Sequence, residues 1–384
     1  MIRKEAIIIG LGISGCVAAR LLADSGYEVT CFEQGSHIGG SLFEEIRPNG
    51  IRVQARGPHV FHTDHEAAYQ YLRRFGSFYP YRHRVLGRFE GKTFPMPLNA
   101  SSLEILFGEE KRDRIIERLH ACFPDAKRVS VDQLNDSSDP VLIDLSRFII
   151  ENLLMPDLNI KEGSHFIPAN DSYENDAYVD IGFDDCYYTD KYQAMPMQGF
   201  TALMENMLSH PAITVYLDMD ALSRISFVEH SSTILLDGVP FNGKVVSTAS
   251  LDSLFSSRFG SLSFRASKLT FKDIAKDFAE EAAVIVTPHS SDCVRVSESK
   301  HITLQELNNK TTICMESPYV SYVNGVDEPF EPCHSQENLD RYAKYLELSK
   351  KYPTLYLLGR LADYENLSIA ESVEEALNCF TSKK

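Results

Sequence analysis

One motif near the start of the chain most restricts its fold: a glycine pattern placed between a strand and a helix. A β-branched run at residues 6–9 is followed directly by a GxGxxG pattern formed by Gly10, Gly12 and Gly15. From Gly15 to Ser25 the apolar residues recur at helical spacing. A strand, a glycine turn and a helix in this order are typical of the first unit of a dinucleotide-binding α/β domain.

Each part of this motif has a physical task in binding a dinucleotide. The first glycine permits a tight turn, the second lets a pyrophosphate approach the backbone, and the third allows the helix to pack closely on the strand. The helix begins with unpaired NH groups and a partial positive charge, which attract phosphate. Such a local site is needed because the chain is acidic, with 54 Asp and Glu against 38 Lys and Arg and a formal charge of −16.

The residues that follow indicate which dinucleotide is bound. A second strand-like run at residues 28–32 leads into Glu33, at the spacing of about 20 residues where a carboxylate binds both ribose hydroxyls. An acid at this place would repel a 2′-phosphate, which disfavours NADP. The paired Gly39 and Gly40 come next, as in many flavoproteins of the glutathione-reductase class, and this resemblance favours FAD.

Composition argues against several other functions. An acidic chain repels polyanions, so we expect neither nucleic-acid binding nor attachment to anionic membranes. The apolar start, residues 6–19, is too short to span a bilayer. The eight cysteines are scattered, without a CxxC pair or a Cys/His cluster at zinc spacing. We therefore expect reduced thiols, a cytoplasmic location and no metal site.

Two segments leave a structural and a functional interpretation open. His59 and His62 lie in an apolar segment and are either histidines satisfied beside a strand or part of a site; a metal is poorly supported because no third ligand lies nearby. Residues 171–190 carry seven acids and four tyrosines. They fit either a solvated loop or the aromatic-lined wall of a ligand site.

The remaining pattern predicts further elements of an α/β protein. Residues 101–159 are helical in pattern. Other helices are predicted at 200–208 and 368–380, and strands at 213–217, 232–236, 244–247, 283–287 and 355–358. Near the end, a buried strand leads into Gly359, Arg360 and a helix. This order indicates one cofactor domain that gathers both termini, with the middle of the chain inserted.

Short motifs spread over nearly the whole chain resemble one family, the flavin-dependent UDP-galactopyranose mutases. Besides the start of the chain through Gly40, they lie at residues 57–63, 83–86, 94–99, 190–196, 199–201, 258–260, 295–301 and 359–364. Several of these motifs are specific to the family. Because they cover so much of the chain, the resemblance predicts the whole fold and not one domain alone.

The resemblance implies an α/β fold of three parts. We expect a Rossmann-like FAD-binding domain (residues 1–78, 193–250 and 335–384), an inserted helical bundle (100–178) and a twisted antiparallel sheet (79–99, 179–192 and 251–334). The resemblance also suggests a homodimer, although no stretch identifies its interface.

The resemblance further implies an enzyme, an intramolecular transferase that interconverts the pyranose and furanose forms of a nucleotide sugar without net redox chemistry. In such enzymes the N5 atom of reduced FAD attacks the anomeric carbon, and the resulting sugar adduct opens, closes through another hydroxyl and recaptures the nucleotide. This is covalent catalysis, in which one difficult exchange becomes two easier displacements. The flavin must be kept reduced by external NAD(P)H or another reductant.

Carried over by motif, the resemblance assigns roles to individual residues. The catalytic set is His59 and His62, placed against the isoalloxazine, together with Arg295, whose planar fork matches the oxygens of the substrate diphosphate. The expected FAD-binding residues are Gly10, Gly12, Ser14, Gly15, Glu33, Gln34, Gly39, Gly40, Gly57, His59, Arg360 and Tyr364. The expected substrate-binding residues are His83, Tyr192, Arg295, Asn366 and Asp180.

Several positions near the substrate depart from the family pattern. The chain has no Trp, although the family carries one in a mobile loop that corresponds to residues 152–159. Asp180 stands where a loop arginine reaches the diphosphate, so that a repulsive charge replaces an attractive one. Asn366 and Ser368 replace a tyrosine and an aspartate, and Ser317 replaces another tyrosine.

Two hypotheses follow from these departures. The first, which we favour, is a mutase that acts on a nucleotide sugar other than UDP-galactopyranose and supplies a furanose for a surface polysaccharide or a natural product. The second is an FAD-dependent oxidoreductase or a catalytically silent FAD-binding homologue on the same scaffold. If Asp180 faces the substrate, its replacement by Arg should improve the binding of UDP-galactose.

Overall fold

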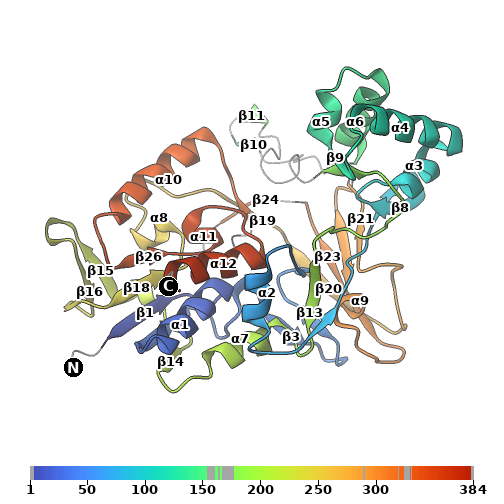
Figure 1. Ribbon diagram of the computed structural model, residues 1–384. Coiled ribbons are helices and arrows are strands. Elements are labelled where there is room, and N and C mark those ends of the chain that lie inside the picture. The colour runs from blue at the N-terminus through green and yellow to red at the C-terminus, as the bar shows by residue number, and fades with distance from the viewer. Residues whose placement is uncertain are drawn as a thin grey trace.

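The computed structural model of the chain contains a parallel sheet, a mixed sheet and a group of helices (Figure 1). It describes residues 4–153, 161–162, 165–166, 177–288, 290–318, 320–323, 329 and 331–381. The segment expected to replace the tryptophan loop, residues 152–159, lies mostly outside the described residues, as does the first part of the acidic stretch, residues 171–176. In the part that is described, no helix is both long and apolar enough to span a bilayer.

The glycine motif opens a five-stranded parallel sheet. Strand β1 (Glu5–Ile9) lies at its centre, between β2 (Glu28–Phe32) and β18 (Lys244–Ser247). Strands β14 (Ile213–Tyr216) and β26 (Leu355–Leu357) extend the two sides, so that the order is β14-β2-β1-β18-β26. Strands from both ends of the chain therefore share one sheet, and the predicted Rossmann-like fold is confirmed.

Helices cover both faces of this sheet because alternate residues of β1 point to opposite sides. Ala6 and Ile8 pack under α1 (Ile13–Asp24) in one core cluster, whereas Ile7 and Ile9 belong to another. The first cluster also includes residues of α2 (Glu66–Leu72), α7 (Phe200–Leu208) and α12 (Ile369–Phe380). The second includes residues of α8 (Leu251–Leu254) and α10 (Gln336–Ser349).

A six-stranded sheet lies beside the parallel sheet (Figure 1). Its order is β20 (Leu269–Ile274), β23 (Thr311–Glu316), β22 (Arg295–Glu298), β21 (Val284–Val286), β7 (Val85–Phe89) and β8 (Lys92–Met96). All neighbours are antiparallel except β21 and β7. The expected antiparallel sheet is therefore mixed, because an early hairpin joins four later strands through one parallel pair.

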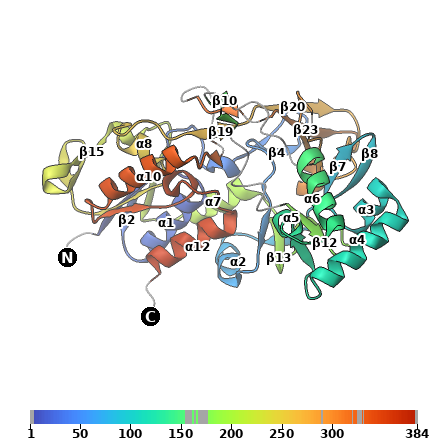
Figure 2. The same cartoon turned by 90° about the horizontal axis from the view of Figure 1, so that it is seen from above.

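A group of helices stands apart from the parallel sheet in both views (Figures 1 and 2). It contains α3 (Ala100–Phe107), α4 (Glu109–Cys122), α5 (Val131–Asn135) and α6 (Pro140–Asn152). These helices form a hydrophobic core of their own, with members such as Leu119 and Leu142. Strand β9 (Arg128–Ser130) emerges from the group and pairs with β12 (Tyr178–Asp180).

The remaining elements are short and connect these larger units. Helices α9 (Ser299–Thr303) and α11 (Arg360–Asp363) are single turns. Two small sheets have two strands each: β3 (Glu44–Ile46) with β4 (Arg52–Gln54), and β10 (Lys161–Glu162) with β11 (His165–Phe166). In two three-stranded sheets the central strand comes from elsewhere in the chain: β13 (Tyr192–Pro196) lies between β5 (Phe61–Thr63) and β6 (Phe78–Pro80), and β19 (Phe264–Ala266) lies between β24 (Val320–Ser321) and β25 (Glu331–Pro332). A third three-stranded sheet contains β15 (Ile225–Val228), β16 (Thr233–Leu236) and β17 (Val239–Phe241) in this order.

The expected division of the chain into three domains remains a prediction. At one boundary the packing differs from it: Leu251, Leu262 and Phe264, expected in the antiparallel sheet, share the core of the parallel sheet with Ile7 and Tyr345. The reason is that the apolar side chains of this segment cover the face of the parallel sheet that α1 leaves open.

Candidate FAD and nucleotide-sugar site

The three glycines of the GxGxxG motif have different surroundings: two are tightly packed and one faces open space. Gly10 has a φ of +88°, and a Cβ atom there would lie 2.2 Å from the Thr248 hydroxyl. A Cβ at Gly15 would lie 2.0 Å from the carbonyl oxygen of Gly10. Around Gly12, in contrast, a Cβ would meet nothing within 4 Å. Gly10 and Gly15 therefore hold the turn and the helix together, whereas Gly12 leaves space for a ligand.

The start of α1 is suited to bind a pyrophosphate. Gly12 is the N-cap residue and makes no side-chain capping bond, so the first NH groups of the helix are not capped from within the motif. Gly40 lies against Gly12, since a Cβ on Gly40 would stand 3.2 Å from the Gly12 Cα. Gly359 approaches Ser14 in the same way, with a Cβ distance of 2.6 Å to the hydroxyl. Residues far apart in the chain thus form one glycine-lined cradle.

Two carboxyl groups lie behind this cradle. The NH of Gly359 donates to Glu375 Oε2 (2.9 Å), and its carbonyl accepts from the NH of Asp363 (2.9 Å). Burial and the hydrogen bond with Glu375 raise the pKa of Asp363 to about 8. The pair thus holds a proton at neutral pH and fixes the turn that leads into Arg360.

Glu33 ends β2 as the sequence predicts. Its two carboxylate oxygens accept bonds from the NH groups of Leu11 (2.8 Å) and Gly35 (2.9 Å). Each oxygen has a second lone pair, so the oriented carboxylate keeps the capacity to accept ribose hydroxyls. The neighbouring Gln34 is exposed. The open Gly12, the uncapped helix and this acid together fit an FAD molecule bound across the end of the sheet.

His59 is held rigidly at its backbone and its ring. Gln54 clamps it, accepting from the His59 NH and donating to the His59 carbonyl, both at 2.7 Å. The ring Nδ1 lies 2.9 Å from the carbonyl oxygen of Gly57, which assigns the proton to Nδ1. Burial and the charges of Arg360 and Arg295 lower the pKa of His59 to about 4, so the ring is neutral at physiological pH.

His62 has a different environment, beside a carboxylate. Its Nδ1 lies 3.0 Å from Asp190 Oδ2, and its ring stacks on Tyr188 with 3.6 Å between the centroids. The two partners come from a segment far along the chain that leads into β13, which pairs with β5. The carboxylate orients the imidazole with Nδ1 toward Asp190, so that Nε2 points to the other side.

His83 completes an aromatic cluster. It is buried, hydrogen-bonds through Nδ1 with the Tyr81 hydroxyl (3.0 Å), and packs against Tyr187 and Tyr188 with centroid distances of 5.9 Å. Burial, followed by the charges of Arg295 and His62, lowers its pKa to about 3. We refer to His62, His83, Tyr187 and Tyr188 as the aromatic wall. Within the described part of the acidic stretch, Tyr187 and Tyr188 are thus packed against the histidines, whereas Phe183 and Asp184 are exposed.

Arg295 acts electrostatically on the two neutral histidines. Its Nε and Nη2 atoms both stand 2.6 Å from Glu316 Oε2, across the pair of strands β22 and β23. Its charge contributes to the lowered pKa of both His59 and His83, which places the guanidinium within electrostatic reach of both rings. The structure therefore brings together His59, His62, His83 and Arg295, and the charge of Arg360 acts on the same group.

Tyr192 departs from the expected position. It is paired with Thr63 in the sheet of β5 and β13, and its ring stacks on Tyr69 of α2 at 4.8 Å between centroids. Side chains alternate along a strand. Tyr192 therefore shares the face of Phe61 and Thr63, opposite to that of His62, and does not line the aromatic wall.

Of the three residues expected near the ligand after Gly359, two have structural tasks. Tyr364 is 1% exposed, and its hydroxyl donates toward the carbonyls of Ser263 (2.6 Å) and Cys333 (2.8 Å), so a direct contact with FAD does not fit its position. Ser368 caps α12 through a capping box with Glu371. Asn366 is exposed and precedes that cap.

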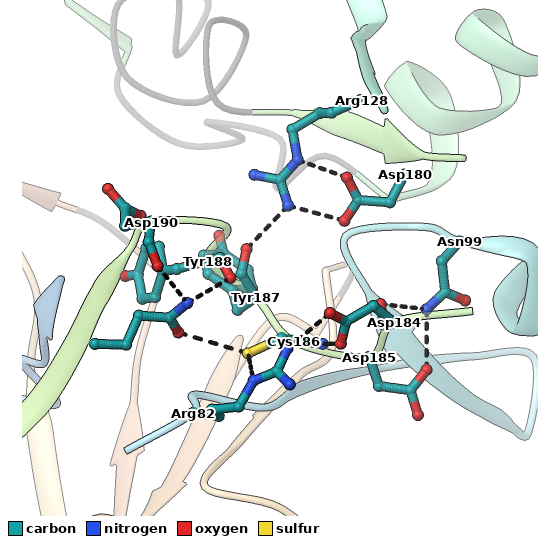
Figure 3. A network of polar contacts seen from close by, with 11 residues as sticks. Arg82, Asn99, Arg128, Asp180, Asp184, Asp185, Cys186, Tyr187, Tyr188 and Asp190 are labelled. Atoms are coloured by element: carbon teal, nitrogen blue, oxygen red, sulfur yellow. Dashed lines mark hydrogen bonds and ion pairs between the residues drawn. The ribbon is translucent and has the colours of Figure 1, made fainter. Parts of the chain in front are cut away.

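Two more positions that depart from the family pattern, Ser317 and Asp180, bond to other residues of the protein. Ser317 accepts a bond from the Lys268 NH (3.0 Å) and donates to the Pro318 carbonyl (3.1 Å). Asp180 forms a bidentate ion pair with Arg128, at 2.6 and 2.8 Å (Figure 3). The expectation of a repulsive charge at Asp180 is therefore wrong as stated, because the carboxylate is neutralised by Arg128.

Sequence reasoning did not single out Asp190, Tyr187, Tyr188 or Arg128, although it left open that residues 171–190 form the aromatic-lined wall of a ligand site. Asp190 stands in a family motif and the tyrosines in a tyrosine-rich stretch, so a signal existed for these three. Arg128 belongs to no motif, and its position follows only from the pairing of β9 with β12.

Comparison with known proteins identifies the family. Residues 170–366, just over half of the chain, match the family described as UDP-galactopyranose mutase. The chain belongs to this family. Residues 8–75 match the NAD(P)-binding Rossmann-like domain, in agreement with the glycine cradle. Membership makes the protein an isomerase of the UDP-galactopyranose mutase type with a flavin-binding fold.

Individual relatives of this mutase-family chain cover nearly its whole length. A probable UDP-galactopyranose mutase of Klebsiella pneumoniae is 27% identical over 98% of this chain and 94% of its own. A dTDP-fucopyranose mutase of Escherichia coli is 26% identical over 98% and 97%, respectively. The crystal structure of a reduced UDP-galactopyranose mutase has a TM-score of 0.69 at 13% identity, with 98% and 95% of the chains covered, and supports the fold.

Proposed function

We propose that this protein is a flavin-dependent mutase that interconverts the pyranose and furanose forms of a nucleotide sugar other than UDP-galactopyranose. The observation that carries the proposal is the cluster of His59, His62, His83 and Arg295 beside a cradle that fits FAD. Relatives named for UDP-galactopyranose and for dTDP-fucopyranose are almost equally similar to this chain. Family membership alone therefore does not favour the galactose substrate.

The cradle residues would hold FAD in a defined orientation. Gly12 and the NH groups at the start of α1 would face the pyrophosphate, and Glu33 would accept the ribose hydroxyls. Bound in its reduced form, FAD supplies the nucleophile for covalent exchange at the anomeric carbon. An external reductant such as NAD(P)H is needed only to keep the flavin reduced, because the interconversion has no net redox change.

Arg295 would bind the substrate diphosphate. Its guanidinium is held by the cross-strand Glu316, which fixes the plane of the fork. The neighbouring His59 and His83 have lowered pKa values of about 4 and about 3 and add no positive charge. They would contact the sugar or the flavin as neutral hydrogen-bonding groups. Arg295, whose Nε and Nη2 are bound to Glu316, would offer the NH donors of Nη1 to a phosphate oxygen.

His62 would exchange protons with the sugar hydroxyls. Asp190 orients its ring through Nδ1, which directs Nε2 away from the carboxylate. Ring opening and closing of a sugar require one hydroxyl to gain a proton and another to lose one. An imidazole with an oriented ring and a carboxylate partner is suited to both transfers.

The substituted positions support a different sugar or nucleotide. Ser317 and Ser368 use their hydroxyls in backbone bonds, and the chain has no tryptophan to cover the base. Asn366, as an exposed amide, would offer different polar contacts from those of a phenol. We expect these changes to alter binding at the sugar and base ends of the ligand while leaving the diphosphate contact in place.

The test is an assay of the reduced, FAD-loaded protein with a panel of UDP-, dTDP- and GDP-sugars in their pyranose forms. Furanose products are separated by anion exchange and identified by NMR. We expect turnover of at least one sugar at a higher kcat/KM than that of UDP-galactopyranose. FAD binding without turnover of any sugar would contradict the mutase activity, and flavin reduction by a substrate would support an oxidoreductase instead.

Two further expectations accompany the proposal. A homodimer would give twice the chain mass of 43.3 kDa in light scattering. A cytoplasmic location fits an enzyme whose activated sugar and reductant are made there. A monomer under assay conditions, or a protein found in a secreted fraction, would correct the respective expectation.

A further inference from the structure

An ion pair outside the sequence motifs stands at the edge of the aromatic wall. Arg128 Nε donates to Asp180 Oδ1 (2.6 Å) and its Nη2 to Asp180 Oδ2 (2.8 Å), in a fork-to-fork arrangement (Figure 3). The two residues face each other directly in the pairing of β9 with β12. Their side chains are only 21% and 13% exposed, so water screens the pair weakly.

The same guanidinium reaches into the aromatic wall. Arg128 Nη2 also donates to the carbonyl oxygen of Tyr187 (3.2 Å), while the Tyr187 NH donates to the carbonyl of His83 (2.8 Å). The backbone of Tyr187 is therefore held from two sides, by Arg128 of β9 and by His83 in the connection between β6 and β7. Asp180 keeps the guanidinium in the orientation that this bond requires.

The rest of the segment is tied down at both ends. Arg82 contacts the side chains of Asp184 and Cys186, and Asn99 bonds the Asp184 carbonyl and the Asp185 carboxylate (Figure 3). Beyond the tyrosines, the Gln193 amide donates to the carbonyls of Tyr188 and Asp190, both at 3.0 Å. Between these two anchored ends, the Arg128 guanidinium holds Tyr187 through its bond to the Tyr187 carbonyl oxygen.

We propose that Arg128 and Asp180 form a positioning pair that holds Tyr187 and Tyr188 against the histidines and so sets the shape of the substrate face. This inference rests on the proposed function, since it names which residues determine that face. The pair acts through the tyrosines and carries little net charge toward the ligand. Replacing Asp180 by Arg would place two guanidinium groups opposite each other and weaken nucleotide binding, contrary to the expectation from charge alone.

The competing interpretation is that Arg128 itself binds the substrate phosphates and Asp180 restrains it. The two interpretations predict opposite effects of Asp180→Asn. If the pair positions Tyr187, weakening it loosens the segment and lowers nucleotide affinity. If Arg128 binds phosphate, removing the competing carboxylate raises the affinity.

The experiment uses the FAD-loaded protein with UDP and dTDP as probes. Binding is measured by calorimetry, and the mobility of residues 181–188 by amide hydrogen exchange. Arg128→Gln and Asp180→Asn should each weaken binding of whichever nucleotide the wild type binds about tenfold, the size expected for loss of a charge-assisted hydrogen bond. Exchange in this segment should accelerate in both, and the double variant should be no worse than either single one.

The matched control is Arg147→Gln, which removes an exposed arginine paired with Asp144 on α6 of the same helical group. It should change neither nucleotide binding nor exchange at residues 181–188. Arg128→Lys, which keeps the charge but loses the fork, should give a smaller effect in the same direction and covers the case in which Arg128→Gln folds poorly.

Three results would overturn the positioning pair: tighter nucleotide binding in Asp180→Asn, weaker binding in Arg128→Gln without faster exchange, or no change of exchange in either variant. If the wild type binds neither UDP nor dTDP, its substrate carries another nucleotide, and the sugar panel that includes GDP-sugars decides the proposed function. The hydrogen-exchange comparison still decides whether the pair holds the segment, so the two failures are distinguishable.

Discussion

Two glycine-to-alanine substitutions, at Gly12 and at Gly15, should distinguish the part of the glycine motif that binds FAD from the part that packs the helix on the strand. In Gly12→Ala the added Cβ meets nothing within 4 Å, and the φ and ψ of −71° and −176° are accessible to alanine. The flavin-free protein should therefore keep its free energy of unfolding or gain up to about 1 kcal/mol from reduced freedom of the unfolded chain.

Gly15→Ala should behave in the opposite way. Its Cβ would stand 2.0 Å from the carbonyl oxygen of Gly10, a backbone atom that cannot turn aside as a flexible side chain could. The helix must move away from the strand, and overpacking of this kind costs about 1–3 kcal/mol of folding free energy. FAD binding should weaken as well, but only as a consequence of the displaced helix.

For Gly12→Ala the cost falls on the ligand. The methyl group occupies the space through which a pyrophosphate approaches the helix. If the strain of accommodating it is again about 1–3 kcal/mol, FAD affinity falls about 5- to 150-fold. Gly12→Ala should thus be stable but bind FAD poorly, whereas Gly15→Ala should be unstable.

The assay combines urea unfolding of the flavin-free proteins with titration of FAD, followed by quenching of flavin fluorescence. Each variant serves as the control for the other, because both add the same methyl group to the same motif. Wild-type FAD affinity in Gly12→Ala, or a loss of more than about 1 kcal/mol in its unfolding free energy, would refute the assignment of Gly12 to the ligand.

Three further predictions concern charge and protonation. His83 has a pKa of about 3 when folded and about 6.5 when unfolded, so the unfolded state gains a proton below pH 6.5, and the wild type should lose about 1.3 kcal/mol of unfolding free energy between pH 7 and pH 5.5 through this residue. In urea unfolding, the unfolding free energy of His83→Gln should depend less steeply on pH than that of the wild type. An unchanged pH dependence would contradict the neutral ring. The pKa of Asp363 is raised to about 8, so the folded state holds a proton that the unfolded state has lost, and the unfolding free energy should fall as pH rises from about 4 to 8. In the same measurement, the unfolding free energy of Asp363→Asn should depend less on pH than that of the wild type. Equal pH dependence would argue against a proton held with Glu375. Arg295→Lys should raise the KM for the accepted nucleotide sugar about tenfold with an unchanged flavin spectrum, because a lysine keeps the charge but cannot bond Glu316 through two donors and still present further NH groups to a phosphate. An unchanged KM would remove Arg295 from the diphosphate site.

The local elements of the cofactor fold could be predicted because short-range forces decide them. The strand at residues 6–9, the glycine turn and the second strand ending before Glu33 lie where the pattern places them. Helix α7 occupies residues 200–208 as predicted. In these segments the periodicity of apolar residues and the conformational range of glycine are properties of the chain alone.

The side of the sheet to which each site residue points could not be predicted from the sequence in the same way. Tyr192 stands in a family motif, yet it lies on the face opposite to His62, because the register of β5 with β13 decides which side each residue occupies. Tyr364 likewise belongs to a motif, but its neighbours enclose it and take its hydroxyl. A motif identifies a position in the chain, whereas the sheet decides the direction of the side chain.

The amino-acid sequence alone thus established the dinucleotide cradle, the family resemblance and the absence of tryptophan, since these depend on residue types at short spacing. Only the tertiary structure showed that Asp180 is neutralised by Arg128 and that His62 is oriented by Asp190. The physical reason is that the effect of a charge depends on the partner within a few ångströms. Strand pairing, which joins residues distant in the chain, decides which partner that is.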